Sequence, residues 1–106
     1  MAWLYLILAG FFEIIWATGL KYTIGFTRII PSIGTLLAMI ISVYLLSLAT
    51  RSLPIGTSYP IWTGIGAIGT VIAGIILFNE PKDLTRMLFI GLIVVGIIGL
   101  RYTSTN

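Results

Sequence analysis

The stretch IGTSYPIWTGIGAIGTVIAGIILF, residues 55–78, decides the fold because it runs from end to end without a charged side chain. About 20 mainly apolar residues form a helix long enough to cross the hydrocarbon core of a bilayer, which is about 30 Å thick. Three further apolar runs, at residues 3–20, 29–50 and 84–100, have comparable length. We therefore predict a single transmembrane domain over residues 1–106, with four spans joined by short loops.

The composition of the chain agrees with lipid as its main solvent. Of its 106 residues, 58% are hydrophobic and 8% are charged, whereas about a quarter of a soluble domain is charged. A chain this small cannot hide so much apolar surface from water. The apolar runs are continuous, whereas strands of a membrane barrel alternate apolar and polar side chains. The expected fold class is therefore an all-α membrane protein.

The residue types that are absent exclude several kinds of chemistry. The chain has no cysteine and no histidine, which excludes disulfides, thiol or histidine catalysis and Cys/His metal sites. We predict no metal and no cofactor. The net charge of +3 comes from scattered basic residues, without the basic run that a nucleic-acid partner would need. Because the first basic residue, Lys21, follows the first apolar run, we expect that run to be retained rather than cleaved as a signal peptide.

Basic residues at the ends of the runs indicate the orientation in the membrane. One side carries Lys21, Arg28, Lys82 and Arg86, and the other side carries Arg51 and Arg101. The positive-inside rule places the side with four basic residues in the cytoplasm. The margin is small, so insertion in both orientations stays open.

Glu13 is an acid inside an apolar run. It follows Trp3 by ten residues, about 15 Å along a helix, which places it near the middle of the membrane. An ionised group at this depth is unfavourable, and acids within spans usually mark the path of an ion or substrate. The alternative is a structural carboxylic acid, kept neutral and hydrogen-bonded between helices. No basic residue lies well inside a predicted span to pair with Glu13.

Aromatic and small residues share helix faces with this acid and with each other. Gly10 and Trp16 lie three residues before and after Glu13, and Tyr59 and Trp62 are also three residues apart, so each set shares a face. A carboxylate and aromatic faces together would form a binding site for a small organic cation or a proton. The alternative is that Gly10 serves helix packing alone and that the aromatic residues serve as packing or lipid-facing bulk.

The second and third runs carry further candidates. Ser42 is a lone hydroxyl midway along the second run; it either joins the site or bonds back to its own helix. Pro60, followed by Gly64 and Gly66, predicts a hinge in the third span, with close helix packing as the alternative.

We expect two subunits, because four helices are too few to enclose a polar pathway. Gly91, Gly96 and Gly99 of the fourth run predict a face for packing against another helix. An antiparallel pair would supply the inverted repeats that alternating access uses, and it would bring two copies of Glu13 together.

These features resemble the small multidrug resistance transporters over essentially the whole chain. The resemblance rests on the four spans, the acid in the first span, and the motifs KYTIGFTR (21–28), LPIGT (53–57) and YPIWTG (59–64). It implies an antiparallel, dual-topology dimer in the bacterial cytoplasmic membrane that exports small organic cations in exchange for protons. It also implies that Glu13 binds proton or cation in a site walled by Tyr59 and Trp62.

The branch of the family follows from the residues around the acid. Glu13-Ile-Ile-Trp16 resembles the guanidinium exporters, in which tryptophan follows the acid by three residues, and Ser42 and Arg101 also fit that branch. Pro60 departs from the usual pattern, which has alanine there. We predict export of guanidinium or substituted guanidinium ions. A quaternary-ammonium exporter and one subunit of a pair with a paralogous chain are the alternatives.

Two other classes of function are alternatives. One is a small membrane adaptor without transport activity. The other is an intramembrane enzyme, which the sequence disfavours because the spans contain no Ser–His pair and no second carboxylate, while Glu80 and Asp83 lie in a loop. We predict that the protein is not an enzyme.

Overall fold

The computed structural model describes residues 1–103 as four α-helices. They are α1 (Ala2–Thr23), α2 (Ile29–Ala49), α3 (Ile55–Phe78) and α4 (Leu84–Thr103). Each helix is long and apolar enough to cross a membrane, and the chain up to residue 103 contains no strand. The prediction of an all-α protein with four transmembrane helices is confirmed. Helices α1 and α4 end at Thr23 and Thr103, somewhat beyond the expected ends at 20 and 100.

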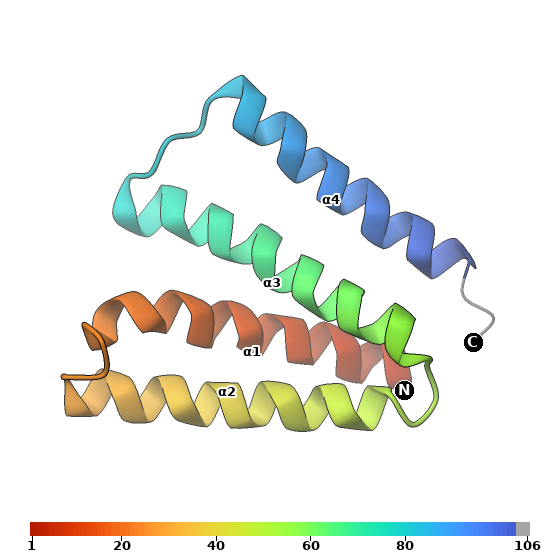
Figure 1. Ribbon diagram of the computed structural model, residues 1–106, viewed down its shortest axis with the longest axis horizontal. Coiled ribbons are helices and arrows are strands. Elements are labelled where there is room, and N and C mark those ends of the chain that lie inside the picture. The colour runs from red at the N-terminus through yellow and green to blue at the C-terminus, as the bar shows by residue number, and fades with distance from the viewer. Residues whose placement is uncertain (104–106) are drawn as a thin grey trace.

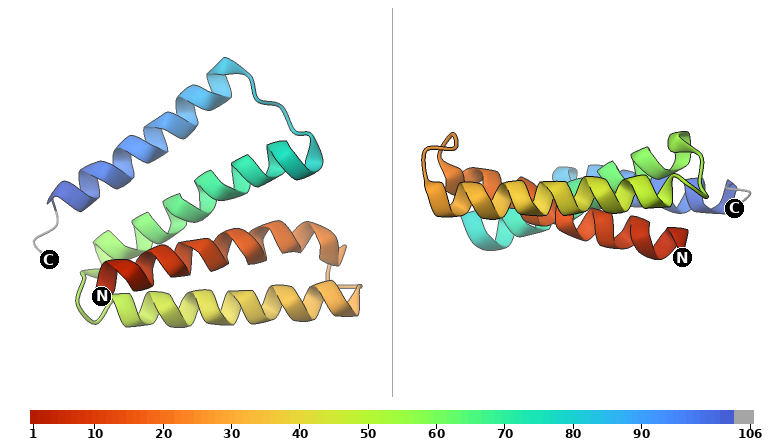
Figure 2. Two further views of the ribbon diagram at one scale, coloured as in Figure 1. Left: turned by 180° about the vertical axis from the view of Figure 1, so that it is seen from behind. Right: turned by 90° about the horizontal axis from the view of Figure 1, so that it is seen from below.

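The helices lie side by side in a single layer, in the spatial order α2, α1, α3, α4 (Figure 1). The molecule measures 43 × 34 × 16 Å, so its smallest dimension is little more than the diameter of one helix. The edge-on view shows this flat shape (Figure 2). The buried core is a small cluster between α1, α2 and α3, and both faces of the layer are open to lipid or to another subunit.

Helix α1 lies within the layer between α2 and α3, and α4 has the fewest contacts with the other helices. The backbone of α1 runs close to both α2 and α3, whereas the backbone of α4 runs close to α3 alone and diverges from it toward Leu84 (Figure 1). No residue of α4 is buried. A side-chain contact adds to this attachment, because the Arg101 guanidinium lies 4.3 Å from the centre of the Trp3 ring.

Glycines bring the central helices together. A Cβ placed on Gly10 of α1 would lie 2.8 Å from the Cβ of Ile65 in α3, and one on Gly69 of α3 would overlap Ile14 of α1. Lipid tails are as apolar as the helix surfaces, so close van der Waals packing drives helix association in a bilayer. The α1–α3 seam therefore depends on the absence of side chains at these positions.

We predict that Gly10→Ala lowers the free energy of unfolding in detergent by about 1–3 kcal/mol, because the added methyl group must displace Ile65, whose Cβ is fixed to the backbone. Gly34→Ala is the matched control, since a Cβ on Gly34 of α2 meets no atom within 4 Å. The stability of both variants is measured by thermal unfolding in detergent, monitored by circular dichroism. A Gly10→Ala protein as stable as the control would contradict the packing described above.

Candidate functional site

A buried chain of hydrogen bonds crosses three helices beside Glu13. The Trp62 indole N–H of α3 donates to the Ser42 hydroxyl of α2 at 2.9 Å. That hydroxyl donates in turn to the Ala9 carbonyl of α1 at 2.6 Å. Ser42 and Ala9 are fully buried, and Trp62 is 8% exposed. Ser42 therefore bonds to a neighbouring helix rather than back to its own.

The hydrogen-bond chain ends one helical turn before the acid. In an α-helix the carbonyl of residue 9 also accepts the backbone N–H of residue 13, so the Ala9 carbonyl is shared between Ser42 and the peptide of Glu13. The indole, the hydroxyl and this carbonyl are thus mutually oriented. These hydrogen bonds fix the positions of α2 and α3 relative to the turn of α1 that carries the carboxylate.

The Glu13 carboxylate lies in the seam between α1 and α3, against Gly66. A Cβ on Gly66 would overlap the carboxyl group of Glu13, so the missing side chain provides the space that the carboxylate occupies. The Oε1 atom is buried and makes no hydrogen bond to any described residue. Within residues 1–103 an ion pair joins Arg86 to Glu80, and no basic side chain pairs with Glu13. The carboxylate keeps acceptor capacity for a proton or for the N–H groups of a cation.

The predicted aromatic residues occupy different environments. The Tyr59 and Trp62 rings lie 5.5 Å apart with a 50° tilt between their planes. Trp62 is buried, whereas Tyr59 is 53% exposed on an open face of the layer. Trp16 is half-buried, and its indole N–H finds no partner among the described residues. The structure therefore joins Trp62 to Ser42 and Tyr59, but no hydrogen bond within residues 1–103 links Glu13 to Trp16 or Tyr59.

The glycines predicted to form the hinge each face another element. Gly64 faces α4, where a Cβ would lie 2.8 Å from the Cδ1 of Ile97, while Gly66 faces Glu13. Pro60 is exposed and lies within α3, which continues through it as one helix. The hinge stays a prediction.

The fourth helix has an open face that includes the glycines predicted for packing. A Cβ on Gly91, Gly96 or Gly99 would meet no atom within 4 Å. A side chain at these positions would therefore meet nothing within residues 1–103, and their role in packing against another copy stays a prediction.

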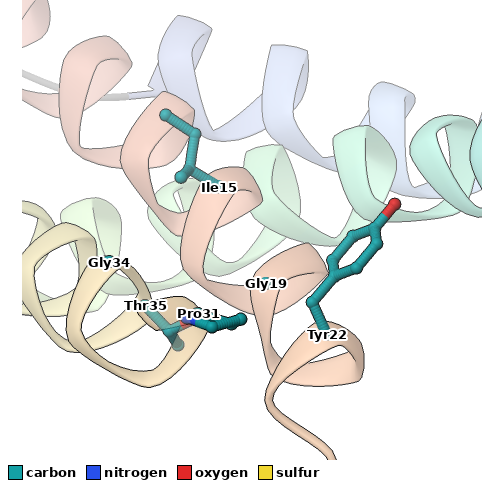
Figure 3. Close-up of a pocket in the computed structure, with 6 residues that line it drawn as sticks. All are labelled: Ile15, Gly19, Tyr22, Pro31, Gly34 and Thr35. Carbon is teal, nitrogen blue, oxygen red and sulfur yellow. The ribbon is translucent and has the colours of Figure 1, made fainter. Parts of the chain in front are cut away.

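One groove of the subunit lies away from these residues. It has a volume of about 370 Å³ between α1 and α2, and Figure 3 shows the six residues that line it: Ile15, Gly19, Tyr22, Pro31, Gly34 and Thr35. Its lining is largely apolar and contains none of the predicted site residues. The groove therefore has no part in the candidate site.

Sequence reasoning missed two parts of this arrangement. The first is the Ala9 carbonyl, because any backbone carbonyl can accept a hydrogen bond and no residue type marks it. The second is the space that Gly66 leaves for the Glu13 carboxylate. The sequence contained a signal for this contact, since Gly66 follows Trp62 by four residues and lies on the same helix face.

Comparison with known proteins identifies the class. Residues 1–93 match the family model described as Small Multidrug Resistance protein, and the chain belongs to this family. With four membrane-spanning helices, it is a multi-pass protein of the bacterial inner membrane. The resemblance drawn from the motifs of the sequence is confirmed.

Individual relatives indicate the branch within the family. The chain is 58% identical over 104 residues to a protein of Yersinia pseudotuberculosis serotype I named "Guanidinium exporter", with 98% of this chain and 100% of the relative covered. It is 55% identical over 104 residues to proteins of the same name from Citrobacter freundii and Salmonella typhimurium, covering 98% of this chain and 99% of each relative. The resemblance to the guanidinium-exporter branch is thus confirmed.

We predict that Ser42 and Trp62 are energetically coupled. Ser42→Ala leaves the buried indole N–H without an acceptor and should lower the free energy of unfolding, whereas the same change in a Trp62→Phe background should have less effect. The double-mutant cycle should give a coupling of about 1 kcal/mol. Ser47→Ala is the control, because that hydroxyl bonds to the Tyr44 carbonyl of its own helix and is exposed. Additive effects of the two substitutions would contradict the hydrogen bond.

Proposed function

We propose that this chain is a proton-coupled antiporter that exports guanidinium or small substituted guanidinium ions. The observation that carries the proposal is the position of the Glu13 carboxylate, which lies in the α1–α3 seam with a buried oxygen that makes no hydrogen bond within the described residues. The relatives named "Guanidinium exporter" support the choice of ion.

The chemistry of the site suits a guanidinium ion. Its planar fork of N–H groups matches the two oxygens of a carboxylate, and it stacks on aromatic faces. Tyr59 and Trp62 offer such faces with their rings 5.5 Å apart, and cation–π attraction is strongest where water is excluded. The Trp62 N–H is already bonded to Ser42, so this indole presents its face rather than its donor to a ligand.

Competition for one carboxylate would couple the two fluxes. A proton and a guanidinium ion each neutralise the negative charge of Glu13, and the carboxylate cannot hold both in the same way at the same time. Release of one would then favour binding of the other. If the site opens alternately to the two sides of the membrane, this exclusion couples the two fluxes, and the proton gradient drives the cation outward as protons move inward.

A second subunit would complete the site. The single layer of helices leaves Tyr59 53% exposed, and a polar pathway cannot stay open to lipid tails. We propose an antiparallel pair with the open face of α4, which carries Gly91, Gly96 and Gly99, in helix–helix contact. The second copy is identical or a paralogous chain. Such a pair is a transporter and not an enzyme.

We predict that Glu13→Gln abolishes guanidinium-driven currents of reconstituted protein, measured by solid-supported membrane electrophysiology. The amide keeps the size of the side chain but holds neither the proton nor the charge. Asp83→Asn is the control, since that carboxylate is exposed in the loop after α3 and should retain wild-type currents. Exchange of guanidinium for protons by the Glu13→Gln protein would contradict the proposal.

The same recordings separate the alternative functions. Guanidinium and alkylguanidinium ions should give currents in the wild-type protein. A response confined to bulky quaternary ammonium ions would favour the multidrug-exporter alternative. Liposomes that move no cation under a pH gradient would favour the adaptor.

We predict that Gly96→Leu weakens subunit association by tenfold or more, equivalent to about 1.4 kcal/mol, because a bulky side chain holds the partner helix away from α4. Gly34→Leu is the control, because Gly34 also has no atom near its Cβ position but lies on α2. Single-molecule photobleaching in liposomes at falling protein density measures the dimer fraction. Equal dissociation of the two variants would contradict the assignment of the α4 face.

A further inference from the structure

A small pocket that polar and apolar side chains line together lies beyond Glu13 along the same α1–α3 seam. Its volume is about 120 Å³, and its lining includes Thr18 and Lys21 of α1, Thr70 and Gly74 of α3, and Glu80 of the loop that follows α3. A water molecule occupies about 30 Å³ of liquid. The cavity is therefore large enough for a short file of water molecules.

The cavity continues the face of α3 against which Glu13 rests. Gly66, Thr70 and Gly74 follow each other at four-residue intervals and therefore share one face. A Cβ on Gly74 would overlap the Glu80 carboxylate, as one on Gly66 would overlap the carboxylate of Glu13. Two carboxylates thus rest on the same face of α3, about 12 Å apart along its axis, with Thr70 midway between them.

The two threonine hydroxyl groups between the carboxylates make no hydrogen bond to the described residues. Thr18 Oγ1 and Thr70 Oγ1 are both buried and have no hydrogen-bond partner among residues 1–103. Threonine in a helix commonly bonds back to a carbonyl of its own helix, but these two do not. A buried hydroxyl without a partner is destabilising, and internal water is the usual partner in a polar cavity. The pair points to water in this cavity.

The outer end of the cavity is fixed by the turn after α3. Asn79 takes the left-handed conformation, with φ of 53°, and the Glu80 N–H donates to the Gly74 carbonyl at 3.2 Å. This turn folds Glu80 back onto the last turns of α3. The side chain of Glu80 is 38% exposed, so it reaches both the cavity and the surface.

The charges facing Glu80 come from two helices. Arg86 of α4 approaches the Glu80 carboxylate, with 3.9 Å between Nη2 and Oε1. Lys21 of α1 lies over the Phe78 ring, with its Nζ atom 4.7 Å from the ring centre. Helix α2 contains no charged residue, and the other charged loop residues, Lys82 and Asp83, do not line the cavity. The positive charge of Lys21 disfavours passage of a guanidinium ion by this route.

We propose that this cavity is a hydrated proton path between the membrane surface and Glu13. Glu80 is the outer carboxylate, and Thr18 and Thr70 hold the water molecules that carry the proton inward. Glu80 takes a proton from bulk water, and each transfer along the file breaks one O–H bond at the donor and forms one at the acceptor. The net result is one proton moved from the surface to Glu13, and the water molecules then reorient before the next transfer. The inference rests on the proposed function, because it supplies the proton that Glu13 exchanges for the cation.

Thiol accessibility tests the water content independently of the substrate. The chain has no cysteine, so Thr70→Cys introduces a single reactive group. A thiol reacts as thiolate, which forms in water but not in lipid. The charged reagent aminoethyl methanethiosulfonate should therefore modify Thr70→Cys in liposomes about tenfold faster or more than Ile72→Cys, the control from an exposed apolar position of α3. Equal rates would overturn the hydrated cavity.

Transport measurements test the role of the path. Glu80→Gln and Thr70→Val should each slow proton-driven guanidinium uptake about tenfold, while exchange of labelled for unlabelled guanidinium, which needs no net proton transfer, keeps its rate. The matched controls are Asp83→Asn for the loop carboxylate and Thr50→Val for the hydroxyl, because Thr50 bonds to the Ser47 carbonyl at the end of α2. Both controls should keep both activities.

The possible outcomes are distinct. Variants that slow both kinds of transport equally would indicate a structural role and overturn the proton path, as would variants that slow neither. A wild-type protein that exchanged no guanidinium would overturn the proposed function and, with it, the role of the path. In that case the cysteine reaction would still report whether water fills the cavity.

Discussion

The constraint on which this structure depends is the absence of water from the bilayer core. Every backbone N–H and C=O must then be paired within the chain, so the spans become helices. Side-chain polar groups must likewise find partners. The chain meets this requirement at its centre by linking Trp62, Ser42 and the Ala9 carbonyl across three helices. The Oε1 atom of Glu13, one turn away, is among the buried polar atoms for which no described residue supplies a partner.

Glycines of α1 and α3 provide the space in which the candidate site forms. Gly66 leaves room for the Glu13 carboxylate, and Gly10 and Gly69 allow α1 and α3 to approach closely around it. Gly64 of α3 thus faces α4, while Gly66 and Gly69 face α1, and a hinge would require these contacts to rearrange. The same face of α3 carries Thr70 and Gly74, the glycine that contacts Glu80, so one helix face runs from Glu13 toward the end of the helix.

Several features were predictable from the sequence because they depend on local pattern. The lengths of the four apolar runs predicted the spans. The three-residue spacing of Tyr59 and Trp62 predicted that their rings share a face, and the rings lie 5.5 Å apart. The predicted ends of α1 and α4 were less accurate, since these helices continue past the apolar residues that mark a span.

The sequence by itself determined the solvent, the helices and the class of protein, because hydropathy and helical periodicity act within one segment. The tertiary structure alone decided that Ser42 bonds to α1 rather than to its own helix. It also decided that Gly66 holds the Glu13 carboxylate and that Glu80 returns to the seam near Thr70. The physical reason is that these contacts join residues far apart in the chain, and their partners are set by how closely whole helices approach. No local pattern records that distance.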